Sequence, residues 1–180
     1  MKKYIIITVL CFSVYGFSQK LYTKTGITEF KGSVEAFEPV EAKNKSTSVV
    51  FNAETGDIAA LLFVKAFDFR VALMQEHFNE NYMDSNTYPK ATFRGKVADL
   101  AYETMKDSRQ HTITGVLNVR GKDKKVETLA TFSKEGDKLK IKGSFRVKPQ
   151  DFDIKIPGIV RKKIAENIII NFEYELVQKK

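Results

Sequence analysis

Apolar and polar residues alternate along most of the chain after residue 18, which is typical of β-strands that bury one face. The clearest segment is 138–147, where Leu139, Ile141 and Phe145 share one face and lysines occupy the other. The same period extends over 90–97, 111–120, 126–132 and 168–176, and three further strands are expected at 27–37, 47–52 and 58–67.

Short polar connections join several of these strands. Gly121, Lys122 and Asp123 form one connection, Glu135 to Asp137 a second and Glu54 to Gly56 a third, all with the composition of hairpin turns. Eight consecutive antiparallel strands predict an all-β fold, because a sheet of about eight strands closes into a barrel that can hold one small ligand.

The interior of this barrel is not settled by the alternation. Its apolar faces mix small residues with large ones, which fits either a tapered core or a cavity. A ten-residue strand is roughly 33 Å long and, tilted by about 40°, rises about 25 Å along the barrel axis. That height would accommodate a long apolar ligand.

Two segments interrupt the alternation. Val71, Met74, Phe78 and Tyr82 are three, four and four residues apart, which predicts a short amphipathic helix leaning on the barrel. Residues 148–163 contain Pro149, Pro157 and Gly158 and are incompatible with a central strand. We expect these two segments to border the mouth of the barrel.

The N-terminus has the features of a secretory signal peptide: Lys2 and Lys3, an apolar run from Tyr4 to Tyr15, and the small residues Gly16 and Ser18. The run is shorter than the ~20 residues of a membrane-spanning helix, which disfavours a retained anchor. A lipoprotein anchored at Cys11 is disfavoured by Leu10, where a small residue is needed. Residues 1–18 are therefore expected to be removed, leaving a single periplasmic or secreted domain at 19–180.

The composition supports a folded, basic domain. The 180 residues are 43% hydrophobic and 29% charged, with 30 Lys and Arg against 22 Asp and Glu. Without residues 1–18 the balance is 28 to 22, and the only cysteine is lost. Such a surface favours anionic headgroups or acidic partners and allows peripheral contact with a membrane, although a solvated exterior has the same composition. No motif indicates a nucleic-acid partner.

The sequence offers little catalytic or metal-binding chemistry. His77 and His111 lack the spacing of zinc ligands, and Asp151 and Asp153 are expected to be loop residues rather than paired catalytic acids. We therefore expect no enzymatic activity, no metal and no cofactor. Two basic clusters, Lys122 to Lys125 and Arg161 to Lys163, could face an anionic headgroup at the barrel mouth or could simply keep the surface soluble.

Three stretches resemble the YceI-like family. They are 77–84 (HFNENYMD) followed by 88–93 (YPKATF), then 113–121 (ITGVLNVRG), and the Asp151-Phe152 step, although Asp153 stands where a Gly is usual. The similarity extends from about Phe37 to Leu176, while the usual early Trp, Asp and His-Ser features are missing. The resemblance implies an exported lipocalin-like barrel that binds a polyisoprenoid in its interior and is not an enzyme.

On this basis the ligand-binding residues are expected among the apolar barrel faces and the helix. They are Phe63, Phe67, Met74, Phe78, Phe93, Ile113, Leu117, Phe132, Ile141, Phe145, Phe152, Ile170 and Phe172. Glycines on the same faces, Gly115 and Gly143, are expected to border an open lumen.

Two other barrels are alternatives. A filled barrel would act through its surface as a cell-envelope stress or assembly partner, without ligand. An outer-membrane barrel would need apolar outer faces, but the polar faces are rich in Lys, Arg and Glu, and the chain ends in Val177-Gln-Lys-Lys180 without a terminal aromatic residue.

The expected cleavage after Ser18 can be tested directly. Mass analysis of the protein from the cell envelope should find Gln19, free or cyclised, at the N-terminus, because the small residues Gly16 and Ser18 suit signal peptidase. Recovery of the envelope protein with Met1 intact would contradict the signal peptide.

Overall fold

The computed structural model describes residues 20–34, 39–102 and 104–178, so the expected signal peptide lies outside the described residues. The strands are β1 (Lys20–Ser33), β2 (Glu41–Asn52), β3 (Asp57–Phe63), β4 (Asp68–Phe69), β5 (Lys90–Val97), β6 (Arg109–Val119), β7 (Lys122–Glu135), β8 (Lys138–Val147) and β9 (Ile164–Gln178). The helical segments are η1 (Val64–Ala66), α1 (Ala72–His77), η2 (Phe78–Tyr82) and η3 (Pro149–Phe152).

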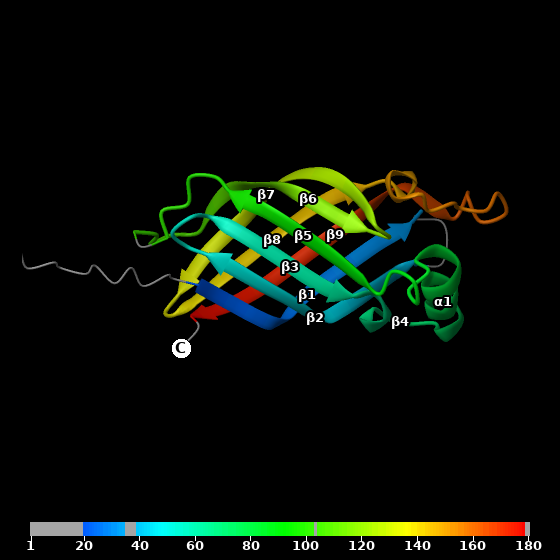
Figure 1. The fold of residues 1–180 in the computed structure, drawn as a ribbon, viewed down its shortest axis with the longest axis horizontal. Helices are drawn as coiled ribbons and strands as arrows, with labels where there is room; N and C mark the ends of the chain where they lie inside the picture. The colour runs from blue at the N-terminus through cyan, green and yellow to red at the C-terminus, as the bar shows by residue number, and fades with distance from the viewer. Residues whose placement is uncertain (1–19, 35–38, 103, 179–180) are drawn as a thin grey trace, which may run out of the picture.

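Eight of the strands form a closed antiparallel barrel, as predicted (Figure 1). Each strand pairs with its neighbour in the order β1-β9-β8-β7-β6-β5-β3-β2, and β1 closes the barrel by pairing with β2 as well as β9. The two-residue β4 adds to β2 at one rim. Because every long strand has two partners, the barrel leaves no long open edge.

The predicted faces of β8 are confirmed. Leu139 and Ile141 are completely buried, while Lys138, Lys140 and Lys142, which alternate with them, lie outside. Lys138 pairs with Glu175 at 2.6 Å and Lys142 with Glu173 at 2.9 Å, both across the β8–β9 ladder. The outer wall is therefore charged, and the apolar residues of the alternation face the interior.

Strand boundaries differ most at the start of the barrel. The first strand begins at Lys20 instead of Ile27, because two register shifts around Gly26 break the regular alternation without ending the pairing with β2. β2 begins at Glu41 instead of Thr47, and its inward residue Asn44 is polar. The Asn44 amide is satisfied internally: it donates to the Phe63 carbonyl at 3.0 Å and accepts from the Ser46 N–H at 2.8 Å.

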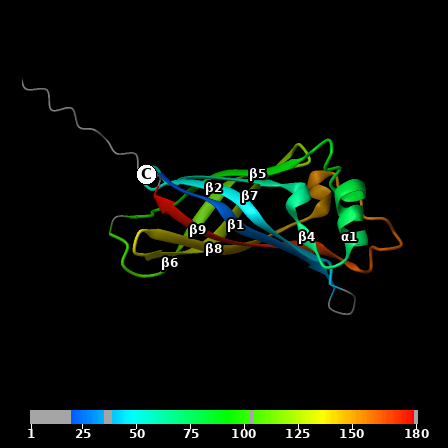
Figure 2. The ribbon, with the colours of Figure 1, turned by 90° about the horizontal axis from the view of Figure 1, so that it is seen from below.

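The predicted helix is present and covers one end of the barrel. α1 continues directly into η2, a single π-helical turn, and the irregular segment 148–163 lies at the same end (Figures 1 and 2). We call this the helix end; β9 finishes at the opposite end. No helix in the described ranges has the length and apolar character needed to cross a bilayer.

The barrel interior is divided into two halves. In the half away from the helix end, which we call the packed half, large side chains are almost inaccessible: Phe51, Phe132, Leu139, Ile141 and Leu176 are all fully buried. On β5, β6, β8 and β9, the inward-facing residues that lie nearer the helix end are only partly buried. We call that part the hollow half.

Candidate functional site

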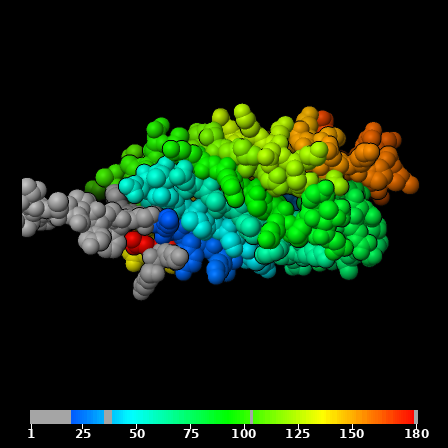
Figure 3. All heavy atoms as spheres, viewed as in Figure 1, coloured from blue at the N-terminus to red at the C-terminus, as the bar shows by residue number. Residues whose placement is uncertain are grey.

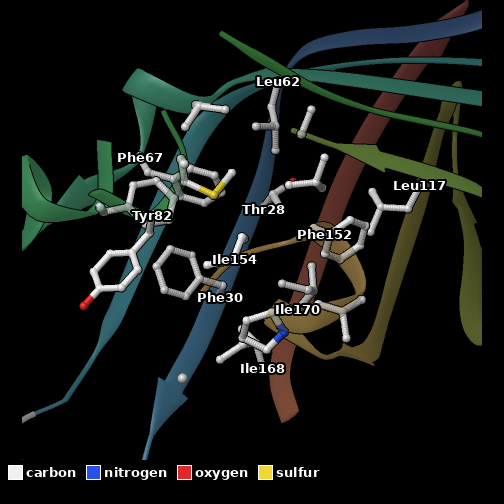
Figure 4. A pocket seen from close by; sticks show the side chains of 18 of the residues that line it. Thr28, Phe30, Leu62, Phe67, Tyr82, Leu117, Phe152, Ile154, Ile168 and Ile170 are labelled. Atoms are coloured by element: carbon white, nitrogen blue, oxygen red, sulfur yellow. The ribbon is translucent and has the colours of Figure 1, made fainter. Parts of the chain in front are cut away.

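The hollow half contains a cavity of about 470 Å³, within the range of about 300–1,000 Å³ typical of small-molecule sites. Its walls come from all eight barrel strands, and its outer end is bounded by α1, η2 and residues 149–163 (Figure 4). Nearly all of the lining is aliphatic or aromatic, as in Phe30, Leu62, Leu117, Ile168 and Ile170. Such a surface can bind a hydrocarbon chain by removing it from water.

Partial exposure of inward-facing side chains marks the cavity as unfilled by protein. Phe93, Leu117 and Phe145 lie on interior faces, yet they are only partly buried, whereas Phe132 and Ile141 at equivalent positions of the packed half are fully buried. Interior apolar surface that stays accessible loses the packing contacts that normally stabilise a core. A matching apolar ligand would recover them.

Aromatic rings that lie against glycines separate the two halves. Gly95 and Gly115 face each other across β5 and β6, and a Cβ on either one would collide with the Phe93 ring and with backbone. Gly143 makes the equivalent space for the Phe172 ring, which stacks on Tyr174 with centroids 5.3 Å apart. The expectation that Gly115 and Gly143 border an open lumen is therefore wrong: aromatic rings already cover them.

A group of three hydroxyls lies at the inner end of the cavity. Thr28 Oγ1 hydrogen-bonds to Thr47 Oγ1 at 2.9 Å and to Tyr174 Oη at 3.2 Å, and all three side chains are buried and line the cavity. Two hydrogen bonds among three hydroxyls leave one O–H proton for water or for a polar atom of a ligand. Burial raises the pKa of Tyr174 to about 12, opposed by its hydrogen bond to Thr28.

An aromatic cluster fastens the helix to the barrel. Phe78 of η2 stacks on Phe30 of β1 with centroids 5.2 Å apart, contacts Phe67 edge-on and contacts the tilted ring of Phe69. Phe67 and Phe78 lie outside the strands and Phe69 lies in the two-residue β4, so strand periodicity alone does not group them. Phe30 was not among the expected ligand residues, although its position between Thr28 and Gly32 on an alternating strand places it on the inner face.

Ten of the thirteen expected ligand residues line the cavity: Phe67, Met74, Phe78, Phe93, Ile113, Leu117, Phe145, Phe152, Ile170 and Phe172. Phe132 and Ile141 face the interior but lie in the packed half, away from the cavity. Phe63 does not face the interior. It is 50% exposed, with the Lys90 ammonium 5.5 Å from its ring, because Ile58 and Leu62 set the inward register of β3 and leave Phe63 outward.

The first basic cluster is occupied by structural ion pairs. Lys122 contacts Asp153 at 2.7 Å and Lys124 contacts Asp151 at 3.0 Å, and the bond from Lys122 lowers the pKa of the Asp153 carboxyl. Arg120 also donates to the Asp153 carbonyl at 2.8 Å. These contacts hold η3 against the β6–β7 turn, and they give Asp151 and Asp153 a structural role. In the second cluster, Lys163 lines the cavity.

Histidines do not assemble a metal site in the described ranges. His77 lines the outer part of the cavity, and His111 lies within 3.1 Å of the Ala98 carbonyl and against the edge of the Phe132 ring. Among the described residues, no group of three potential ligands is close enough to hold a metal.

Comparison with protein families gives one match. The model of the YceI-like domain matches residues 11–176, a range that begins inside the expected signal peptide. A search of curated proteins found no match.

Solved structures share the fold at low identity. A structure described as a polyisoprenoid binding domain from Saccharophagus degradans, implicated in plant cell wall breakdown, superposes with a TM-score of 0.78 at 11% identity, covering 89% of this chain and 99% of that one. Burkholderia cenocepacia BcnA gives 0.69 at 21% identity, covering 84% and 96%. The Campylobacter jejuni YceI protein gives 0.61 at 18%, covering 80% and 87%. At these identities the likeness concerns the fold.

The buried hydroxyl group predicts a loss of stability at alkaline pH. In the unfolded chain Tyr174 ionises near its ordinary value of 10, whereas the folded protein keeps it neutral to about 12. The unfolding free energy should therefore be unaffected by this group below pH 10 and fall by on the order of 2 kcal/mol between pH 10 and 12. Denaturant titrations of Tyr174→Phe should show a smaller fall; the same fall in variant and parent would contradict the assignment.

Proposed function

Because the chain belongs to the YceI-like family, we propose that it is an exported carrier or sequestering protein for an amphiphilic lipid, a polyisoprenoid, held in the hollow half of the barrel. The observation that carries this proposal is the apolar cavity itself, whose lining side chains face inward and yet remain accessible. Binding by burial needs no covalent chemistry. The name of the Saccharophagus degradans domain supports the choice of a polyisoprenoid.

Burial of hydrocarbon supplies the affinity. Each methylene moved from water into an apolar site contributes about 0.8 kcal/mol, so even a short prenyl chain gains several kcal/mol before the entropy of ordering it is subtracted. The packed half occupies part of the barrel height that the sequence suggested for the ligand. A long chain must therefore fold back inside the cavity or extend through the helix end.

Polar atoms at both ends of the cavity define two sites for a headgroup. The three hydroxyls of Thr28, Thr47 and Tyr174 lie at the inner end, whereas Lys163 and His77 lie among the exposed residues of the outer end. A charged headgroup loses too much hydration at the inner end, where none of the described lining residues is a cation that could pair with it. We therefore place a charged headgroup at the outer end, with the chain pointing inward.

The proposal differs from a filled barrel that acts through its surface. That alternative requires side chains to fill the interior, and the open space of about 470 Å³ argues against it. Export to the periplasm or the medium is part of our proposal and depends on the signal peptide expected at residues 1–18.

Two identical substitutions in different halves test the site. Ala91→Phe on β5 should fill part of the cavity, reducing retention of a fluorescent prenyl lipid by tenfold or more on the ~1.4 kcal/mol scale of a tenfold change. Its unfolding free energy should change by less than about 1 kcal/mol, because the space is already there.

Ala130→Phe is the matched control, since Ala130 is 1% exposed in the packed half. Overpacking should destabilise it by about 1–3 kcal/mol, while the lipid retained per folded molecule stays near that of the parent. If Ala91→Phe is destabilised as strongly as Ala130→Phe and the parent retains no prenyl lipid, the carrier proposal fails.

A further inference from the structure

The segment from Ile154 to Lys163 has two different faces at the helix end of the barrel. Ile154, Ile156 and Val160 turn inward and line the cavity. Between and after them, Lys155, Ile159, Arg161 and Lys162 are exposed. The wall of the cavity and an outward-facing surface are thus built from the same ten residues.

Ile159 is the most exposed large hydrophobic residue in the described chain, with 89% of its surface accessible. It follows Pro157 and Gly158 in a pair of successive turns, held by hydrogen bonds from Val160 N–H to the Pro157 carbonyl and from Lys163 N–H to the Val160 carbonyl. Apart from Gly158 and its two chain neighbours, no described residue has a heavy atom within 4 Å of a Cβ added to Gly158. The turns therefore hold an apolar side chain away from the protein and into the surroundings.

The cations around Ile159 are free for an external partner. Lys155, Arg161 and Lys162 form no ion pair with any residue that the structure describes. The acids nearest in sequence already have partners: Asp151 pairs with Lys124, Asp153 with Lys122, and Glu166 with Lys148 at 2.9 Å. The exposed face of the segment is consequently both apolar and positive.

We infer that this segment docks the protein on an anionic lipid bilayer, with Ile159 entering the headgroup region and Lys155, Arg161 and Lys162 contacting lipid phosphates. An exposed apolar residue flanked by cations is the combination that binds such a surface, because burial of the apolar group and attraction to phosphate act together. α1 lies at the same end and exposes Leu73 to 57% (Figures 1 and 3).

Docking through this segment also sets how the cavity is oriented relative to the bilayer. Since Ile154, Ile156 and Val160 line it from within, docking through the outer face of the segment turns the helix end of the barrel toward the bilayer. The inference goes beyond the proposed lipid carrier function and does not require the cavity to be occupied. The docked segment is then the surface along which a lipid chain could pass between the membrane and the barrel.

Vesicle co-sedimentation of the purified protein tests the inference. Vesicles of phosphatidylcholine with phosphatidylglycerol should bind the parent protein, and vesicles of phosphatidylcholine alone should bind it much less. Ile159→Ser should lower the apparent affinity for the anionic vesicles by about fivefold. The double variant Arg161→Gln with Lys162→Gln should lower it by about tenfold or more, and added salt should reduce this difference because it screens exposed charges.

Matched controls distinguish docking by this segment from nonspecific adsorption of the protein to vesicles. Leu129→Ser removes a hydrophobic residue that is 59% exposed on β7, and Lys24→Gln with Lys45→Gln removes two exposed charges from the side of the barrel. Both controls should bind anionic vesicles as the parent does. Equal losses in control and segment variants, or capture of a protein by the segment with no vesicle binding by the parent, would overturn the inference.

Retention of the prenyl lipid in the same variants keeps the two proposals apart. Ile159→Ser should keep preloaded lipid while losing vesicle binding, and Ala91→Phe should lose the lipid while still binding vesicles. If the parent carries no lipid but docks through Ile159, only the carrier proposal fails. If lipid is retained and no variant changes vesicle binding, only the docking surface fails.

Discussion

The contact between aromatic rings and glycines in the barrel wall is the constraint on which the site depends. Gly95 and Gly115 leave room for the Phe93 ring, and Gly143 leaves room for the Phe172 ring, so that these rings lie across the interior instead of being forced toward the helix end. A barrel of eight strands can fill its interior with side chains or leave space for one ligand. Here the rings form a boundary, with a core on one side and a cavity on the other.

The two halves then have different roles. The packed half contains the fully buried side chains, including Phe51 and Phe132, and supplies the stability that an interior with a cavity lacks. The hollow half relies on its surroundings for rigidity: the Phe30–Phe78 stack holds the helix, and the pairs of Lys122 and Lys124 with Asp153 and Asp151 hold η3. Both attachments lie at the helix end, so the outer boundary of the cavity is fixed by contacts separate from the main core.

The fold was largely predictable because period-two alternation and short turns are local signals. Strands such as β8 follow them closely, whereas β1 and β2 begin earlier than expected because the two register shifts around Gly26 and the inward Asn44 interrupt the pattern without breaking the pairing. The cavity lining was also partly predictable, since alternation assigns residues to the inner face. It does not say how far along the barrel a residue lies, so Phe132 and Ile141 could not be separated from Phe145. Contacts between residues far apart in sequence, as between the Thr28 and Tyr174 hydroxyls, had no local signal at all.

Native mass spectrometry of the protein purified from its own cell envelope tests the central claim most directly, because it detects the ligand that the cell supplies. If the apolar cavity of about 470 Å³ holds a lipid, the folded protein should carry an additional mass that denaturation releases, and lipid extraction should identify it as a polyisoprenoid. A folded protein with the mass of the polypeptide alone, obtained under conditions that preserve lipid on a known lipid-binding protein, would contradict the account.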